Sequence, residues 1–289
     1  MIHYQTLEKI PVETLYQTFL EAFSDYAVQF QLSLEEYKNM LKRRGFTPEV
    51  SVGVFHNKEL VGFVLNGLRE IEGHLTAYDV MTGIVPSSRK QGLSKEMFRF
   101  VLQTFSEAGV MQYILEVLQE NRTAFDIYQK QGFRIVRSFD VFKLEQKIAG
   151  PKKEMSNIVF VTELSDEHWA LVQTFWKSSP SWQNAIASIK NTPAAFFYAL
   201  ATIDRKIVGY GIVDKKTGDV PQLAVHGKYQ NLGIEQQLLA ALQDKTESST
   251  LSLVNIDTEL KDKIELLQTI GFKRTTSQYE MILDSDKPK

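Results

Sequence analysis

One stretch of the sequence combines the end of a strand, two basic residues and a glycine in the pattern of an anion-binding turn. It reads Gly83-Ile84-Val85-Pro86-Ser87-Ser88-Arg89-Lys90-Gln91-Gly92-Leu93-Ser94. The first turn of a helix carries unpaired N–H groups and partial positive charge, and Arg89 and Lys90 add full charges beside a helix that begins near Gly92. The segment therefore predicts a phosphate site. On residue types alone, an ordinary strand-to-helix turn with basic residues on its surface explains it equally well.

The elements that must position this turn alternate between strands and amphipathic helices. Ser33, with Glu36 three residues on, predicts a capping box that opens a helix ending at Gly45. We expect helices over residues 12–23, 33–45, 92–107 and 121–130, and strands over residues 50–55, 59–66, 76–85, 113–118 and from Phe133. This order predicts a mixed α/β (α+β) domain, a twisted mixed sheet flanked by helices.

The same order of elements starts again in the second half of the chain, after a polar stretch from Lys147 to Ser156 that reads as a linker. Three pairs of segments, each about 140 residues apart, support two copies of one domain. They are Leu60-Val61-Gly62-Phe63-Val64 with Ile207-Val208-Gly209-Tyr210-Gly211, Arg89-Lys90-Gln91-Gly92-Leu93-Ser94 with Gln230-Asn231-Leu232-Gly233-Ile234-Glu235, and Gln131-Gly132-Phe133 with Ile270-Gly271-Phe272. We predict tandem domains over residues 1–148 and 156–289.

The phosphate turn resembles the pyrophosphate-binding motif of the GNAT superfamily of N-acetyltransferases, Arg/Gln-x-x-Gly-x-Gly/Ala. Here the motif is Arg89-x-x-Gly92-x-Ser94, with a serine where the family has glycine or alanine. A second similar feature follows in order: Leu115-Glu116-Val117, Asn121, Ala124, Tyr128 and Gly132-Phe133. The resemblance covers residues 50–142 well and residues 197–283 more weakly. It implies two tandem GNAT-like domains, each with a sheet that splays to admit a pantetheine arm.

The resemblance also implies acetyl-coenzyme A as co-substrate of the first domain. The residues that it places at the cofactor are Gly83, Ile84, Val85, Arg89, Lys90, Gln91, Gly92, Leu93, Ser94 and Asn121. The pantetheine arm would pair like an extra strand with backbone groups near Gly83 and Ile84. Asn121 has a simpler interpretation too, as the N-cap of the following helix.

Acetyl transfer to an amine needs a base, because holding a lysine-like amine of pKa about 10.4 neutral near pH 7 costs about 5 kcal/mol. We assign that role to Asp79, in the strand that leads to the phosphate turn. Aspartate is disfavoured in strands, so Asp79 needs a partner, which can equally be structural. The resemblance maps the acid that protonates departing coenzyme A onto Tyr128. The alternative is that Tyr128 belongs to the apolar side of its helix.

Acceptor binding in this family usually falls to the link between the first two helices. Here the link contains Asp25 and Tyr26, which could hold an ammonium group or form a polar turn with an anchoring ring. The second domain looks degraded, because Glu235 puts negative charge where phosphate would lie and Leu267 takes the place of Tyr128. We expect that half to be structural or to shape the acceptor site.

The bulk composition narrows the function. Lys+Arg total 33 against 35 Asp+Glu, so nothing in the charge favours nucleic acid or membrane as a partner. There are no cysteines and only scattered histidines, so we expect no metal and no cysteine acyl-enzyme. No secretory signal is visible, which makes a cytoplasmic setting the default. Whether the protein forms a homodimer stays open.

The sequence thus predicts an acetyl-CoA-dependent N-acetyltransferase that acts on a small-molecule or peptide amine by direct transfer. Two alternatives remain: a non-catalytic acyl-CoA-binding regulatory module, and an acyltransferase that uses another acyl donor.

Overall fold

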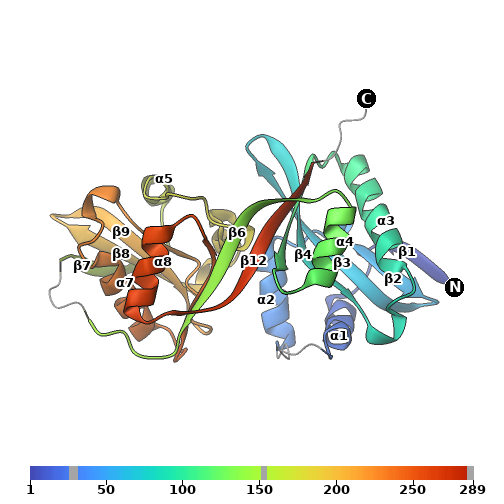
Figure 1. Ribbon diagram of the computed structural model, residues 1–289, viewed down its shortest axis with the longest axis horizontal. Coiled ribbons are helices and arrows are strands. Elements are labelled where there is room, and N and C mark those ends of the chain that lie inside the picture. Colours follow the sequence, from blue (N-terminus) through green and yellow to red (C-terminus); the bar gives the residue numbers. More distant parts are fainter. Residues whose placement is uncertain (26–31, 151–154, 285–289) are drawn as a thin grey trace. The chain divides into compact units, whose positions relative to one another are not determined.

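The computed structural model describes residues 1–25, 32–150 and 155–284. The elements of the first half are β1 Ile2–Thr6, α1 Val12–Ala22, α2 Leu34–Arg44, β2 Val52–His56, β3 Glu59–Ile71, β4 His74–Ile84, α3 Leu93–Ala108, β5 Gln112–Leu118, α4 Arg122–Lys130 and β6 Arg134–Leu144 (Figure 1). Those of the second half are β7 Asn157–Val161, α5 Asp166–Gln173, α6 Ile186–Asn191, β8 Phe196–Ile203, β9 Lys206–Asp214, β10 Gln222–Val225, α7 Ile234–Lys245, β11 Leu251–Asp257, α8 Lys261–Ile270 and β12 Lys273–Asp284.

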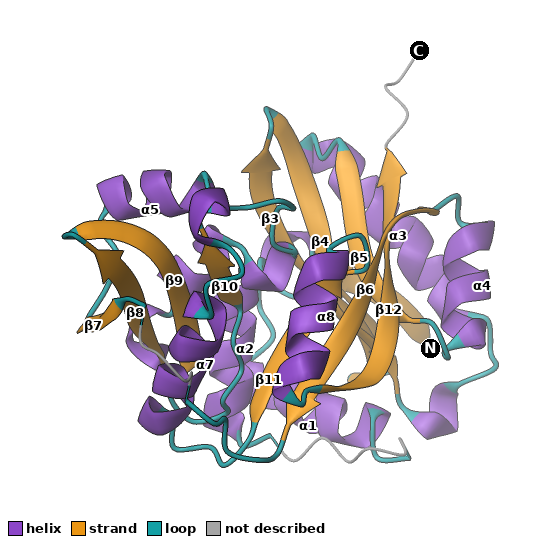
Figure 2. Ribbon diagram, turned by 60° about the vertical axis from the view of Figure 1, so that its left-hand side comes forward, coloured by secondary structure: helices purple, strands orange, loops and turns teal. Residues whose placement is uncertain are grey.

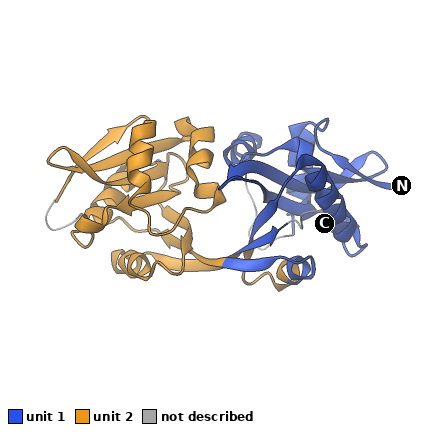
Figure 3. Ribbon diagram, turned by 90° about the horizontal axis from the view of Figure 1, so that it is seen from above, with its two compact units in different colours: residues 1–116, 126–136, 280–289 blue, residues 117–125, 137–279 orange. Residues whose placement is uncertain are grey.

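The chain forms two compact units whose segments interleave along the sequence. Unit 1 contains residues 1–116, 126–136 and 280–289, and unit 2 contains residues 117–125 and 137–279 (Figure 3). The end of β12 therefore belongs to unit 1, whereas most of β6 belongs to unit 2. The boundary predicted near residues 148–156 remains a prediction, and residues 151–154 of the expected linker lie outside the described residues.

The sheet of unit 1 runs in the order β1-β2-β3-β4-β5, and the end of β12 follows beside β5. Neighbours from β1 to β4 are antiparallel, and β4 and β5 are parallel. α1 packs on β3 and β4, and α3 packs on β2 and β3. Their apolar stripes supply the core, with Leu15 and Phe19 from α1 and Met97 and Val101 from α3 all at most 1% exposed.

Local signals in the sequence located these elements closely. Ser33 and Glu36 make the predicted capping box, and Gly45 and Gly109 end α2 and α3 in the left-handed conformation. The turn between β2 and β3 is the two-residue hairpin Asn57-Lys58, with Asn57 at φ 59°. β1, which no sequence signal predicted, pairs with β2 from Ile2↔His56 to Thr6↔Val52.

Unit 2 has a four-stranded sheet of order β10-β9-β8-β7 and a separate antiparallel pairing of β11 with β6. Two apolar clusters pack on the four-stranded sheet, one around α7 and one around Trp169 and Val172 of α5. Residues 146–149 are hydrogen-bonded to α7. The side chain of Gln243 bonds the backbone of Gln146 and Ile148, and the side chain of Gln236 bonds the carbonyl of Ala149. Across the described ranges, no helix is long and apolar enough to cross a membrane.

Candidate active site

The central strands of unit 1 part at Asp79. The parallel ladder between β4 and β5 joins Thr76–Tyr78 to Gln112–Ile114 and ends there, although both strands continue. One residue later the pairing of β4 with β3 slips, because Leu65 faces Met81 while Asn66 faces Asp79. Val80 is thus the extra residue of a β-bulge, a feature that redirects side chains next to it.

The bulge brings a hydroxyl donor onto the carboxylate of Asp79. In a regular strand residues 79 and 82 would face opposite sides, but one inserted residue places both on the same side. Thr82 Oγ1 donates to Asp79 Oδ2 at 2.7 Å. The Asp79 Oδ1 atom is shielded from water and has no hydrogen-bond partner among the described residues. Burial raises the pKa of Asp79 to about 6, against the opposing effect of its hydrogen bonds from Thr82 and Tyr128.

The helix that follows β5 carries the second candidate group to the same carboxylate. Tyr128 lies on α4, and its phenol donates to Asp79 Oδ2 at 3.3 Å. The Tyr128 ring packs edge-on against Phe133, with 5.6 Å between ring centroids. Tyr128 therefore packs as an apolar helix residue and also directs its hydroxyl at Asp79. A carboxyl with a pKa near neutrality that bonds a phenol can exchange protons with it.

The predicted phosphate turn has the backbone that an anion site needs. Lys90 and Gly92 have φ of 62° and 77°, and Gly92 is the N-cap of α3 without a side-chain cap for the helix amides. The space where a Cβ on Gly92 would point is open, with no atom within 4 Å. The first-turn N–H groups of α3 are thus available to an acceptor outside the helix, and a diphosphate is such a group.

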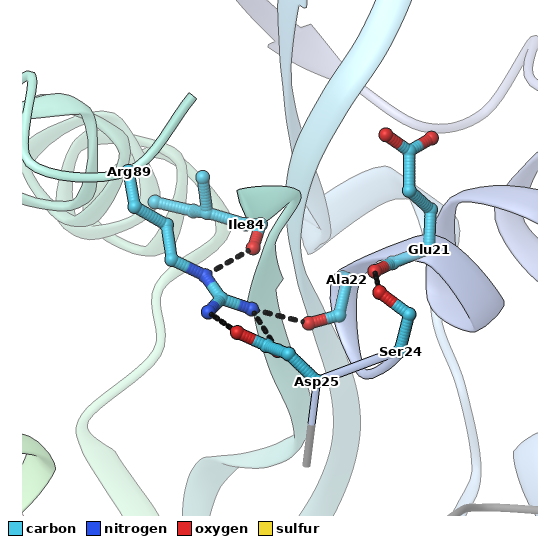
Figure 4. A network of polar contacts seen from close by, with 6 residues as sticks. All are labelled: Glu21, Ala22, Ser24, Asp25, Ile84 and Arg89. Atoms are coloured by element: carbon cyan, nitrogen blue, oxygen red, sulfur yellow. Dashed lines mark hydrogen bonds and ion pairs between the residues drawn. The ribbon is translucent and has the colours of Figure 1, made fainter. Parts of the chain in front are cut away.

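Arg89 contacts the end of α1. Its guanidinium forms a two-bond ion pair with Asp25, at 2.6 and 2.9 Å (Figure 4). It also donates to the carbonyls of Ala22 at 2.6 Å and Ile84 at 2.9 Å. Two residues that the sequence analysis gave separate roles, cofactor for Arg89 and acceptor for Asp25, thus bind each other. The carbonyl of Ile84, a predicted partner of the pantetheine arm, is bonded by the same arginine.

The remaining predicted residues occupy several environments. A Cβ on Gly83 would come within 3.1 Å of Phe23 and Phe63, so this glycine lets α1 approach β4. Asn121 caps α4, since its Oδ1 accepts from the Ala124 amide at 3.1 Å, which confirms the capping prediction. Val85 and Leu93 are buried, Ser94 is half-buried, and Lys90 and Gln91 are exposed. Tyr26 lies outside the described residues.

Comparison with known proteins gives the family. Residues 12–133 match the model described as Acetyltransferase (GNAT) family, and residues 160–281 match a second one described as Acetyltransferase (GNAT) domain. The chain belongs to the GNAT acetyltransferase family. It carries two GNAT domains in tandem, as the repeat predicted.

Solved structures show the same fold over the whole chain. A tandem GNAT protein from the clavulanic acid biosynthesis pathway is similar with a TM-score of 0.74 and 14% identity, covering 100% of both chains. A putative acetyltransferase from Pyrococcus horikoshii is similar with a TM-score of 0.69 and 17% identity, covering 99% of this chain and 89% of that one.

A chloroplastic GCN5-related N-acetyltransferase 6 of Arabidopsis thaliana is 36% identical over 55 residues, which span 19% of each protein.

The second GNAT unit repeats the backbone of the turn but not its chemistry. Asn231 and Gly233 have φ of 64° and 80°, like Lys90 and Gly92. In the first turn of α7, however, Glu235 stands where unit 1 has Ser94, and its negative charge opposes a phosphate at this turn. In unit 2, the position that corresponds to Tyr128 is occupied by Leu267, which is completely buried.

Two contributors to the site escaped the sequence analysis. Thr82 bonds Asp79, and Arg44 of α2 donates to the bulged carbonyl of Val80 at 3.1 Å. Thr82 alternates away from Asp79 in a regular strand, so only knowledge of the bulge could have found it. Arg44 lies 36 residues before Val80, and no local pattern links them. In the part of the chain that the structure describes, no cluster of three or more metal-binding side chains occurs.

Proposed function

We propose that unit 1 transfers an acetyl group from acetyl-CoA directly to a primary amine of a small molecule or peptide. One observation carries the proposal: a carboxyl of raised pKa and a phenol share a hydrogen bond where β4 and β5 part. The uncapped N-terminus of α3 at Gly92 supports it, because a thioester held there by its diphosphate extends along the freed edge of β4.

The proposed reaction begins with proton removal. Asp79, ionised above pH 6, takes a proton from the ammonium form of the acceptor directly or through water. The neutral nitrogen then attacks the thioester carbonyl, so that a C–N bond forms and the C–S bond breaks, and the nitrogen releases its second proton to water.

The hydrogen bond between the two groups lets them return to their starting states. The departing thiolate takes the phenolic proton of Tyr128, and the proton held by Asp79 passes to Tyr128 along the bond between them. The products are an amide and free coenzyme A. The chain has no cysteine, so no thioester of the enzyme itself can form.

The test is calorimetric titration with acetyl-CoA, followed by a thiol-release assay against a panel of primary amines. We expect binding, and thiol release that depends on the amine and falls in the Tyr128→Phe variant. Tyr229→Phe, in unit 2, is the matched control and should behave like the wild type. A protein that gives no binding heat with acetyl-CoA would refute the proposal, as would thiol release that no amine accelerates.

A further inference from the structure

Unit 2 contains a cavity of about 840 Å³. It opens where β10 and β11 separate. The Val220 amide donates to the Ser252 carbonyl, and the Ser252 amide donates to the Gly218 carbonyl. Beyond this bridge, β10 pairs with β9 and β11 pairs with β6. The N-terminal turns of α7 and α8 complete its wall, and Figure 2 labels these elements. A cavity of this size holds a metabolite-sized molecule.

The charged residues that line the cavity fall into two groups. Five of them bond another lining residue: Lys177 with Asp262 at 3.0 Å, Lys261 with Glu259 at 3.9 Å, and Asp257 with the hydroxyl of Ser178 at 2.7 Å. The other two are Glu235 and Lys263. Neither has an ion pair within 4.0 Å among the described residues, although one is an anion and the other a cation.

These two charges have lost water without gaining an ion-pair partner. Burial lowers the pKa of Lys263 to about 8 and raises the pKa of Glu235, and their mutual attraction opposes both shifts without cancelling them. The ammonium of Lys263 donates to the carbonyl of Leu223 at 2.7 Å. Within the described ranges its two other N–H groups have no acceptor. Both side chains are half-buried, and charges removed from water are normally paired, so this arrangement is incomplete.

The pair is particular to unit 2. Counted from the glycine of each helix-opening turn, Glu235 stands at the position of Ser94 in unit 1. Counted back from each Gly-Phe pair, Lys263 stands at the position of Ala124. Two small residues of unit 1 are thus replaced by opposite charges, and the carboxylate opposes a diphosphate at the α7 turn.

We propose that this cavity binds a small zwitterion, with its ammonium at Glu235 and its carboxylate at Lys263. Such a ligand supplies each charge with the ion pair that the protein lacks. Polar groups line the same cavity: Trp176 Nε1 donates to the Tyr210 hydroxyl at 2.6 Å, and that hydroxyl donates to Gln222 Oε1 at 2.8 Å. Because these groups already bond one another, the two charges and the apolar wall provide the recognition. The proposal does not depend on the chemistry assigned to unit 1.

The experiment uses the full chain and a series of ω-amino acids, from 4-aminobutanoate to 8-aminooctanoate, in calorimetric titration. Each is compared with the carboxylic acid and the amine of the same chain length. At least one amino acid should bind about tenfold more tightly than either single-charge analogue, since each contact of opposite charges adds affinity. Lys263→Met and Glu235→Gln should each remove that gain.

Matched variants and a second readout complete the test. Lys206→Met and Glu265→Gln change exposed charges outside the cavity and should bind like the wild type, as should Asp79→Asn, which separates this site from unit 1. In the wild type, the best ligand should slow reductive methylation of Lys263, measured by mass spectrometry. Amino acids that bind no better than their single-charge analogues would overturn the proposal, as would unchanged binding in both Lys263→Met and Glu235→Gln.

Discussion

The phenol of Tyr128 and the carboxylate of Asp79 meet at 3.3 Å, from residues 49 positions apart in the sequence. Asp79 comes from the bulged strand β4 and Tyr128 from the helix α4, and Thr82 Oγ1 bonds the same carboxylate oxygen at 2.7 Å. The candidate base and the candidate acid are therefore one coupled unit, and changing either should alter the titration of the other.

The first prediction concerns the pH dependence of transfer. Burial raises the pKa of Asp79 to about 6, and a base works only when ionised, so kcat/KM should rise with pH and level off above that value. Asp79→Asn should lower kcat by about 100-fold and abolish this rise. Rate profiles from pH 5 to 8 measure it. An Asp79→Asn enzyme with a wild-type profile would remove Asp79 from the reaction.

The second prediction concerns stability, and its sign follows from the same shift. The folded-state pKa of Asp79 lies above the unfolded value of about 3.9, so wild-type stability falls as pH rises from 4 to 6. Asparagine never ionises, so the stability of Asp79→Asn relative to the wild type should increase across that range. The difference in the free energy of unfolding should be about 2 kcal/mol larger at pH 8 than at pH 4. Urea unfolding at the two pH values measures it. A difference that does not change with pH would contradict the assigned pKa.

The third prediction is that Tyr128→Phe lowers turnover at least tenfold while acetyl-CoA affinity stays within about twofold, since only the proton donor is lost. The hydrogen bond from Tyr128 lowers the pKa of Asp79, so its loss should also move the acid limb of the rate profile to higher pH. Turnover equal to that of the wild type would remove the acid role. A limb that stays in place would mean that the two groups are not coupled.

The fourth prediction uses the two copies of the helix-opening turn. Gly92→Asp should abolish acetyl-CoA binding, because it puts a carboxylate and a strained left-handed residue where the diphosphate is expected. Gly233→Asp makes the same change in the same conformation in unit 2 and should leave binding intact. Calorimetry on both variants decides it. Equal losses would show that unit 2 also binds the cofactor or that the change acts through folding.

The fifth prediction separates the structural role of Arg89 from contact with phosphate. Lysine keeps the charge but cannot bond Asp25 and the carbonyls of Ala22 and Ile84 together. Arg89→Lys should destabilise the protein by about 1 kcal/mol with little change in acetyl-CoA affinity. Hydrogen bonding to Arg89 lowers the pKa of Asp25, so the contribution of this pair is present above about pH 4 and lost below it. A large loss of affinity without loss of stability would place Arg89 at the phosphate.

Local sequence signals were sufficient to predict most helices and strands and their repetition in the second half of the chain. Capping residues such as Ser33, Gly45 and Gly109 act within a few residues, so the ends of α2 and α3 could be read directly. The two helix-opening glycines, 141 positions apart, mark the same turn in both halves because each needs a positive φ. The edge strand β1 was not predicted, because its five residues mix polar and apolar side chains and include no capping or turn residue.

The assembly of the site depends on contacts between residues that are distant in the sequence. The bulge at Val80 turns Thr82 toward Asp79, and it depends on the pairing of β3 with β4 rather than on any residue preference. The pairing of Arg89 with Asp25 joins residues 64 positions apart. Residues 280–284 of β12, which include the fully buried Met281, belong to unit 1, whereas the preceding residues of the same strand belong to unit 2. Alternation along a strand specifies which face is buried, whereas the choice of neighbouring strand rests on contacts distant in the sequence.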